Sequence, residues 1–136
     1  MASPKRHKVS HDPNTSIGTT DKKTTGVIAV IELVPRPNKR EALIEALHFV
    51  EEQVQRKQEC LCSGVFEAMD KGGHVFYVEQ WESAEGLDAH IRSSLYLRIL
   101  HAIELASEAP RVSFQEISRT SSMELIERLR HRRDRG

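Results

Sequence analysis

Residues 75–94, VFYVEQWESAEGLDAHIRSS, most constrain the fold of this chain, because a strand there runs almost directly into a helix. β-Branched and aromatic residues favour a strand at the start of the segment. The two-residue period of a strand places Tyr77, Glu79 and Trp81 on the same face. The chain therefore presents a carboxylate and an indole together at the end of one strand.

The helix that follows is predicted to begin at Ser83, whose hydroxyl can accept a hydrogen bond from a free N–H group of the first turn. Leu87, His90 and Ile91 then recur at the spacing of an apolar helix face. His90 therefore points toward the core rather than toward solvent. Two interpretations stay open: a catalytic imidazole, or a core histidine whose ring nitrogens are satisfied by hydrogen bonds.

The rest of the pattern predicts strands over residues 27–33, 61–68, 74–81 and 111–117. A first helix is expected from a cap at Asn38 to about Lys57, and helical apolar content continues after Ser83 to about Ala106. The order β-α-β-β-α-β is the split, ferredoxin-like arrangement of the α+β class, with an antiparallel sheet. Its helices cover one sheet face only, so a homodimer through the other face is expected.

Composition divides the chain into three regions. Residues 1–25 are expected to be a disordered tail, because they contain few large apolar side chains. Residues 26–118 form the α+β domain, and residues 119–136 form a basic helical extension. The extension carries a narrow apolar seam of Met123, Ile126 and Leu129. A helix with such a seam can dock on a partner subunit.

The charges are balanced overall, with 20 basic and 20 acidic residues, but they are unevenly distributed. Residues 1–25 and 119–136 each carry a net charge of +3, which leaves −6 on the middle of the chain. An acidic body disfavours nucleic-acid binding. No apolar run is long enough to span a membrane, and the amino end lacks the apolar segment of a secretory signal. A cytoplasmic location is therefore expected.

The two cysteines, Cys60 and Cys62, lie two residues apart in one predicted strand. Their side chains are expected to point the same way, so a disulfide between them would distort the strand. A Cys-x-Cys pair alone supplies half of a tetrahedral zinc site, and the chain has no second pair. Neither a disulfide nor a metal site is expected.

Three short motifs carry a family resemblance: Glu59-Cys60, EQWES at residues 79–83 and LDAHI at residues 87–91. With the predicted strand order, they make the chain resemble the antibiotic biosynthesis monooxygenase family, and within it the quinol monooxygenase-like members. The resemblance covers about residues 26–118. It implies a dimeric α+β barrel that oxidises an electron-rich quinol or polycyclic aromatic substrate with O2, without a metal, flavin or other cofactor. One departure is Glu59, where the family usually has glycine.

The resemblance makes His90 the candidate base that deprotonates the substrate, since imidazole exchanges protons near neutral pH. Glu79 is its carboxylate partner, an acceptor for a substrate hydroxyl, or a structural group at the strand end. Trp81 stacks on a flat substrate, donates its N–H to a developing oxyanion, or fills the core. Tyr77 and Tyr96 line the substrate cleft or pack against it. Trp81 and His90 should then share a cavity between helix and sheet.

The same residues bear on two alternatives to an oxygenase. Haem degradation, which some family members perform, is disfavoured because the first strand has no Asn and the haem-ligand position falls at Leu100. His101 is one residue out of register, a rotation of about 100° on a helix. The other alternative is a non-catalytic small-molecule-binding or assembly module of the same fold, which the C-terminal extension supports. Fold alone does not decide between these functions.

Overall fold

The computed structural model describes residues 26–69 and 72–135. Residues 1–25, for which we expected a disordered tail, lie outside the described part of the chain. The elements follow one another as β1, α3, β2, β3, α4, α5, β4 and α6. This order confirms the ferredoxin-like α+β fold, with the second helical region divided in two and a further helix after the last strand.

Four antiparallel strands form one sheet in the order β2-β3-β1-β4. The strands span Val27–Leu33 (β1), Cys60–Glu67 (β2), Val75–Trp81 (β3) and Arg111–Glu116 (β4). In β1, Ala29 pairs with Glu79 on one side and with Phe114 on the other. Alternate residues of β1 and β3 are buried, as the two-residue period predicts. Tyr77, Glu79 and Trp81 therefore share the covered face of the sheet.

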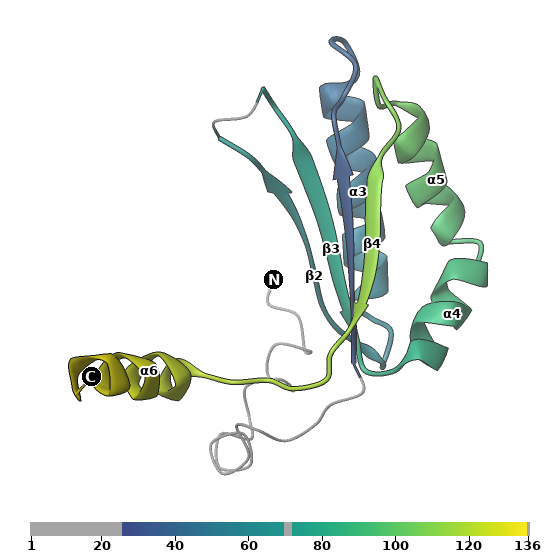
Figure 1. The fold of residues 1–136 in the computed structure, drawn as a ribbon. Helices are drawn as coiled ribbons and strands as arrows, with labels where there is room; N and C mark the ends of the chain where they lie inside the picture. Colours follow the sequence, from purple (N-terminus) through teal and green to yellow (C-terminus); the bar gives the residue numbers. More distant parts are fainter. Residues whose placement is uncertain (1–25, 70–71, 136) are drawn as a thin grey trace.

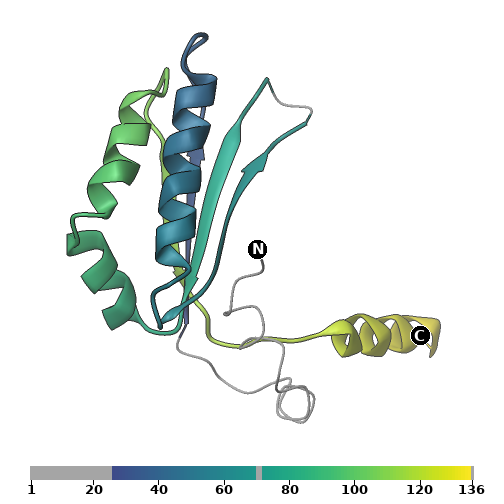
Figure 2. The same cartoon turned by 180° about the vertical axis from the view of Figure 1, so that it is seen from behind.

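Helix α3 covers one face of this sheet, and α5 packs beside α3 (Figures 1 and 2). The helices span Arg40–Val54 (α3), Ala84–Arg92 (α4), Tyr96–Glu104 (α5) and Met123–Arg135 (α6). The main core forms between α3, α5 and the sheet. Its largest fully buried members include Leu33, Leu43, Leu47, Tyr77 and Ile99. Burial of this apolar surface is the principal stabilising contribution to the domain.

The first helix is shorter than predicted at both ends. Asn38 lies in a turn and is not the helix cap, because α3 begins only after Lys39, whose side chain makes no capping hydrogen bond. The turn is closed by the Lys39 N–H, which donates to the Arg36 carbonyl at 2.9 Å. At the other end the helix stops at Val54, so Lys57 lies on the connection to β2 rather than on the helix.

The helical region predicted from Ser83 to about Ala106 is interrupted at Ser93. Ser93 has an extended backbone, and its hydroxyl donates to the His90 carbonyl at 2.6 Å. The Ser93 N–H also donates to the His90 carbonyl, at 3.0 Å, so two groups of Ser93 close the end of α4. α5 begins at Tyr96, which packs edge-on against the His90 ring.

The other face of the sheet is not covered by the helices (Figure 1). Its apolar side chains are partly or largely exposed and belong to Ile28, Val30, Phe66, Phe76 and Val78. Phe66 is 58% exposed and lies over Gly64, where a Cβ would stand 2.7 Å from the phenyl ring. An aromatic ring over a strand glycine supports strand pairing. The uncovered face is thus an apolar surface built on a regular sheet.

A β-bulge between Cys60 and Cys62 corrects the prediction for the two cysteines. Cys60 pairs with Trp81 and is buried, whereas Cys62 pairs with Gln80 and is exposed. The extra residue of the bulge reverses the alternation of the strand. The two side chains therefore point to opposite faces of the sheet, not the same way, and neither cysteine is in a disulfide.

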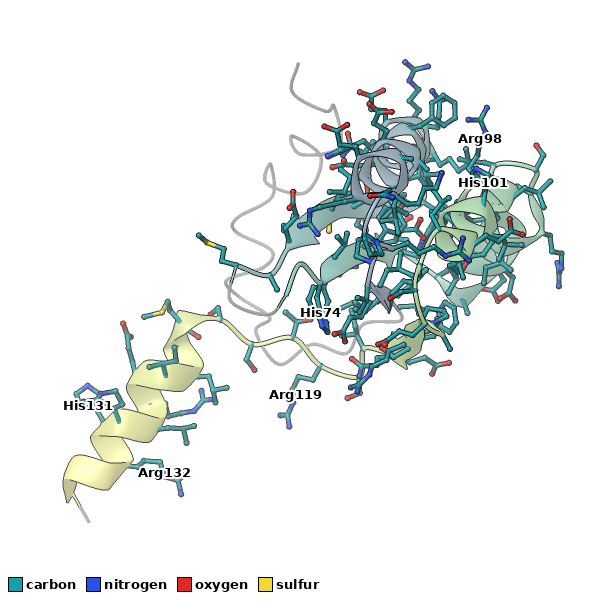
Figure 3. All side chains as sticks on the ribbon, turned by 90° about the horizontal axis from the view of Figure 1, so that it is seen from above. His74, Arg98, His101, Arg119, His131 and Arg132 are labelled. Carbon is teal, nitrogen blue, oxygen red and sulfur yellow. The ribbon has the colours of Figure 1, made fainter. Side chains whose placement is uncertain are left out.

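Helix α6 stands apart from the sheet and from the other helices (Figure 3). Its apolar seam faces solvent: Met123, Ile126 and Leu129 are 62%, 51% and 47% exposed. His131 and Arg132 are exposed on the same helix (Figure 3). Neither α6 nor any other helix in the described residues is long and apolar enough to cross a membrane.

Candidate functional site

His90 lies in the last turn of α4, and its side chain is completely buried. The Ser83 hydroxyl accepts a hydrogen bond from the Gly86 N–H at 3.1 Å, so α4 begins as the sequence predicts. Since α4 starts three residues after Trp81, its inner face lies against the end of β3. His90 there meets Glu79, with Nε2 2.9 Å from Oε2.

The buried Glu79 carboxylate is surrounded by hydrogen-bond donors. The Tyr77 hydroxyl donates to Oε2 at 2.6 Å, and Trp81 Nε1–H donates to Oε1 at 2.9 Å. With His90, three side chains therefore hold one carboxylate inside the protein. Hydrogen bonds to a charged acceptor offset the free-energy cost of burying that charge. These contacts make Glu79 a hydrogen-bond partner of His90, and they equally fit a structural group at the strand end.

The contact with Glu79 assigns the proton on the His90 ring. An ionised carboxylate accepts hydrogen bonds only, so Nε2 donates to it. In the neutral ring Nδ1 then carries the lone pair and accepts a hydrogen bond from Lys57. Lys57 Nζ lies 3.4 Å from Nδ1. The basic nitrogen of His90 therefore faces Lys57 rather than the sheet.

Two aromatic rings flank the imidazole. The Trp81 ring centroid lies 4.9 Å from that of His90 at an interplanar angle of 30°, and the Tyr96 centroid lies 5.2 Å away at 82°. Because the Trp81 N–H already donates to Glu79, the ring face is what Trp81 can offer a substrate. Burial and the nearby Glu79 charge raise the pKa of Tyr77 and of Tyr96 above the usual tyrosine value. Both hydroxyls therefore stay protonated at neutral pH.

A cavity of about 210 Å³ lies beside these rings. The described residues that line it are Lys57, Gln58, Glu59, Trp81, Gly86, Ala89 and His90. Trp81 and His90 thus share a cavity, as the sequence predicts. Tyr77 and Tyr96 are not among these lining residues: Tyr77 belongs to the main core, and Tyr96 packs against the His90 ring.

Glu59 forms one wall of the cavity. The Ser83 hydroxyl donates to Glu59 Oε1 at 2.9 Å, and the Glu82 N–H donates to the Glu59 carbonyl at 2.8 Å. A Cβ at position 86 would collide with Glu59 Oε1, so the close approach requires Gly86. The exposed Glu59 carboxylate thus lies at the N-terminus of α4, where the helix dipole favours a negative charge.

Lys57 is the site residue that sequence reasoning did not find, and Glu59 was noted only as a departure from the family pattern. Lys57 is separated from His90 by 33 residues, and no local pattern relates the two. The motif Glu59-Cys60 was the available signal, because it marks the start of the strand that borders the cavity. The cation and the carboxylate at the cavity wall thus come from one short connection.

Two other histidines of the domain, His74 and His101, are labelled in Figure 3 and do not line the cavity. His74 Nδ1 is 2.6 Å from Glu32 Oε2, next to the hairpin that joins β2 and β3. His101 is exposed on α5, with Nδ1 3.9 Å from Glu104 Oε1. Across residues 26–69 and 72–135, no three His, Cys, Asp or Glu side chains are grouped in a way that could hold a metal ion.

The model of the antibiotic biosynthesis monooxygenase family matches residues 26–102, more than half of the chain. The chain belongs to this family. The match includes every described residue that lines the cavity and every member of the Glu79 hydrogen-bond network. No curated protein sequence matches the chain significantly.

Solved structures share the family fold. Rv0793 from Mycobacterium tuberculosis is 26% identical, with a TM-score of 0.62 over 67% of this chain and 93% of that one. A conserved protein of unknown function from Bacteroides thetaiotaomicron, described as a possible oxidoreductase, is 20% identical with a TM-score of 0.63, over 68% and 98%. A conserved protein from Methanosarcina mazei is 17% identical with a TM-score of 0.64, over 73% and 95%.

Proposed function

We propose that this family member is a cofactor-independent monooxygenase that oxidises an electron-rich quinol or related aromatic molecule with O2. The observation that carries the proposal is the buried His90–Glu79 pair, whose imidazole lines a cavity together with the Trp81 ring. A base held beside a binding cavity is what deprotonation of a quinol requires. The deprotonated quinol is itself the reductant, so the proposal includes no metal or flavin.

In the first step His90 Nδ1 accepts the proton of a substrate hydroxyl. Glu79 Oε2, 2.9 Å from Nε2, stabilises the imidazolium that forms. The Trp81 ring face holds the flat substrate next to the base. The product of this step is an electron-rich phenolate inside the protein.

In the second step the phenolate transfers one electron to O2, and the semiquinone and superoxide combine to form a carbon–oxygen bond. His90 returns its proton to the peroxide. The O–O bond then breaks as the ring carbon loses its hydrogen as a proton, and water leaves. One oxygen atom stays in the product, and the substrate supplies all four electrons. A hydroquinone thus gives a hydroxyquinone and water without an external reductant.

The metal-stripped wild-type protein should therefore consume one O2 per quinol oxidised. With ¹⁸O₂, one labelled atom should appear in the product. An oxygen electrode and mass spectrometry of the product measure the two quantities across a panel of quinols, anthrones and dihydroxynaphthalenes. Stoichiometric hydrogen peroxide with no label in the product would indicate an oxidase instead, and no uptake on any substrate would leave the proposal without support.

We also propose that two copies of the chain pair through the uncovered sheet face. Five apolar side chains on that face are partly or largely exposed, and Phe66 alone is 58% exposed. Burial of apolar surface contributes about 25 cal/mol per Å², which favours covering this face with the same face of a second copy. Cys60 and Cys62 form no disulfide, which agrees with a reducing compartment, and we propose the cytoplasm.

A second candidate function, assembly without catalysis, is favoured by α6. The apolar seam of this helix is exposed along its length, and Arg128, Arg130 and Arg132 lie on the same helix. The rest of the domain has an excess of acidic residues. A second copy of the domain therefore offers a partner of complementary charge.

Deleting residues 119–136 separates these two candidates. We expect the shortened chain to remain dimeric and to keep its O2 uptake, because it retains the uncovered sheet face and the whole cavity. Light scattering and the oxygen electrode measure the two properties at one protein concentration. Loss of the dimer, with small-molecule binding unchanged, would favour the assembly module.

A further inference from the structure

We infer that the cavity beside His90 binds a single-ring phenol as its phenolate, with the phenolate oxygen held between Lys57 Nζ and His90 Nδ1. This inference rests on the proposed function, since it names the substrate class of the same cavity. It makes Lys57 the residue that binds the anionic oxygen. Glu59 becomes the residue that limits the size of the substrate.

Lys57 brings a positive charge within reach of the base. Its Nζ lies 3.4 Å from His90 Nδ1, and its backbone N–H donates to the Val54 carbonyl at 2.9 Å just after α3. An ammonium group has three hydrogens, so it can contact Nδ1 and a substrate oxygen at once. A phenolate oxygen is the group that accepts from both the ammonium and the imidazolium.

The proton balance of this arrangement is simple. The phenol O–H bond breaks as Nδ1 takes the proton, and the charge left on oxygen is opposed by two cations. The imidazolium is in turn held by Glu79 through Nε2, 2.9 Å from Oε2. The imidazolium and the Lys57 ammonium are like charges 3.4 Å apart, and the phenolate oxygen beside both of them, with Glu79 behind the imidazolium, offsets their repulsion.

The volume of the cavity restricts the substrate to one ring. At about 210 Å³ it is smaller than the roughly 300–1,000 Å³ of pockets for drug-sized ligands. It is larger than the cavity of about 150 Å³ that is known to hold benzene. One ring with its hydroxyl groups fits inside this space, which is open to solvent, and a second fused ring has to pass Glu59 at its exposed rim.

Glu59 is the wall that sets this limit. Its side chain is exposed, and its carboxylate is held toward α4 by the Ser83 hydroxyl, which donates to Oε1 at 2.9 Å next to Gly86. The carboxylate also accepts hydrogen bonds. The second hydroxyl of a single-ring quinol can therefore donate a hydrogen bond to the Glu59 carboxylate. This negative group complements the positive charge of Lys57.

The test uses 4-nitrophenol, a single-ring phenol that resists oxidation by O2 and whose phenolate absorbs at a longer wavelength than the phenol. At a pH where the free probe is mostly protonated, the full-length wild-type chain should bind it with the phenolate spectrum. Lys57→Met keeps the methylene stem and removes the charge. It should lower the affinity about 10- to 100-fold and return the bound spectrum to that of the neutral phenol. Lys57→Arg should keep the phenolate spectrum.

Lys39→Met is the matched control, because Lys39 is exposed at the start of α3, and it should bind the probe as the wild type does. Unchanged affinity and a phenolate spectrum in Lys57→Met, with a native circular dichroism spectrum, would overturn the inference. Since the probe is not turned over, phenolate binding without O2 uptake on any quinol would refute the oxygenase and leave the inference standing. O2 uptake with no phenolate binding would overturn the inference and leave the oxygenase proposal standing.

A second probe tests the limit on size. The compound 4-nitro-1-naphthol carries the same chromophore on two fused rings, and the wild type should bind it about tenfold or more weakly than 4-nitrophenol. Glu59→Ala should bring the two affinities together by opening the wall. Equal affinities for both probes in the wild type would overturn the single-ring assignment.

Discussion

Replacing His90 with glutamine is expected to slow O2 uptake by a factor of about 10² to 10⁴, the contribution typical of a positioned general base. The glutamine amide can still donate a hydrogen bond to Glu79, as Nε2 of the imidazole does at 2.9 Å. It offers no basic nitrogen where Nδ1 faces the cavity. The variant therefore separates the loss of the base from the loss of the fold, and the initial rate in an oxygen electrode measures the effect.

His101→Gln is the control for this experiment. His101 has a side chain that is 65% exposed, and it does not line the cavity. Its replacement should leave the rate unchanged. A His90→Gln protein that stays folded and consumes O2 at the wild-type rate would show that His90 is not the base, while the family assignment would be unaffected.

Replacing Glu79 with leucine is expected to lower the free energy of unfolding by about 3–5 kcal/mol, the range for removing one partner of a buried charged network. Leucine has a similar size but accepts no hydrogen bond. The Tyr77 hydroxyl, the Trp81 N–H and the His90 Nε2–H would all lose their acceptor inside the protein. Trp81 is the only tryptophan of the chain, so its fluorescence during urea unfolding reports on this network directly.

A double-mutant cycle with Tyr77→Phe controls for the change of shape. Phenylalanine removes one of the three donors, so it should cost about 1 kcal/mol alone and less than that in the Glu79→Leu background. The measurement requires one protein concentration throughout, because association with a second copy adds to stability. Additive costs would mean that the hydrogen bond between Tyr77 and Glu79 contributes little.

The covered face of β3 was predictable because its cause is local. Successive strand residues point to opposite faces, so Tyr77, Glu79 and Trp81 had to share one face wherever the strand lay. The cap at Ser83 is local as well, since the hydroxyl bonds within its own first turn. Together these two rules predict that His90 faces inward near the end of the same strand.

Other local rules failed where distant parts of the chain decided the outcome. Asn38 has a side chain that can cap a helix. It lies instead within the turn that reverses the chain after β1, so the helix begins later. Cys60 and Cys62 obey the strand alternation until a bulge, set by pairing with β3, turns them to opposite faces. Ser93 ends α4 because its hydroxyl bonds to the His90 carbonyl, which competes with continuation of the helix. The spacing of apolar residues does not predict this bond.

The sequence by itself determined the order of the elements, the face shared by Glu79 and Trp81, and the inward direction of His90. These depend on backbone periodicity and on caps that act within a few residues. Only the tertiary structure brought Lys57 to 3.4 Å from His90 Nδ1 and set Glu59 as a wall beside it. Lys57 and His90 are 33 residues apart in the sequence, and their contact depends on how α4 packs against the connection that follows α3. That packing is a property of the whole fold.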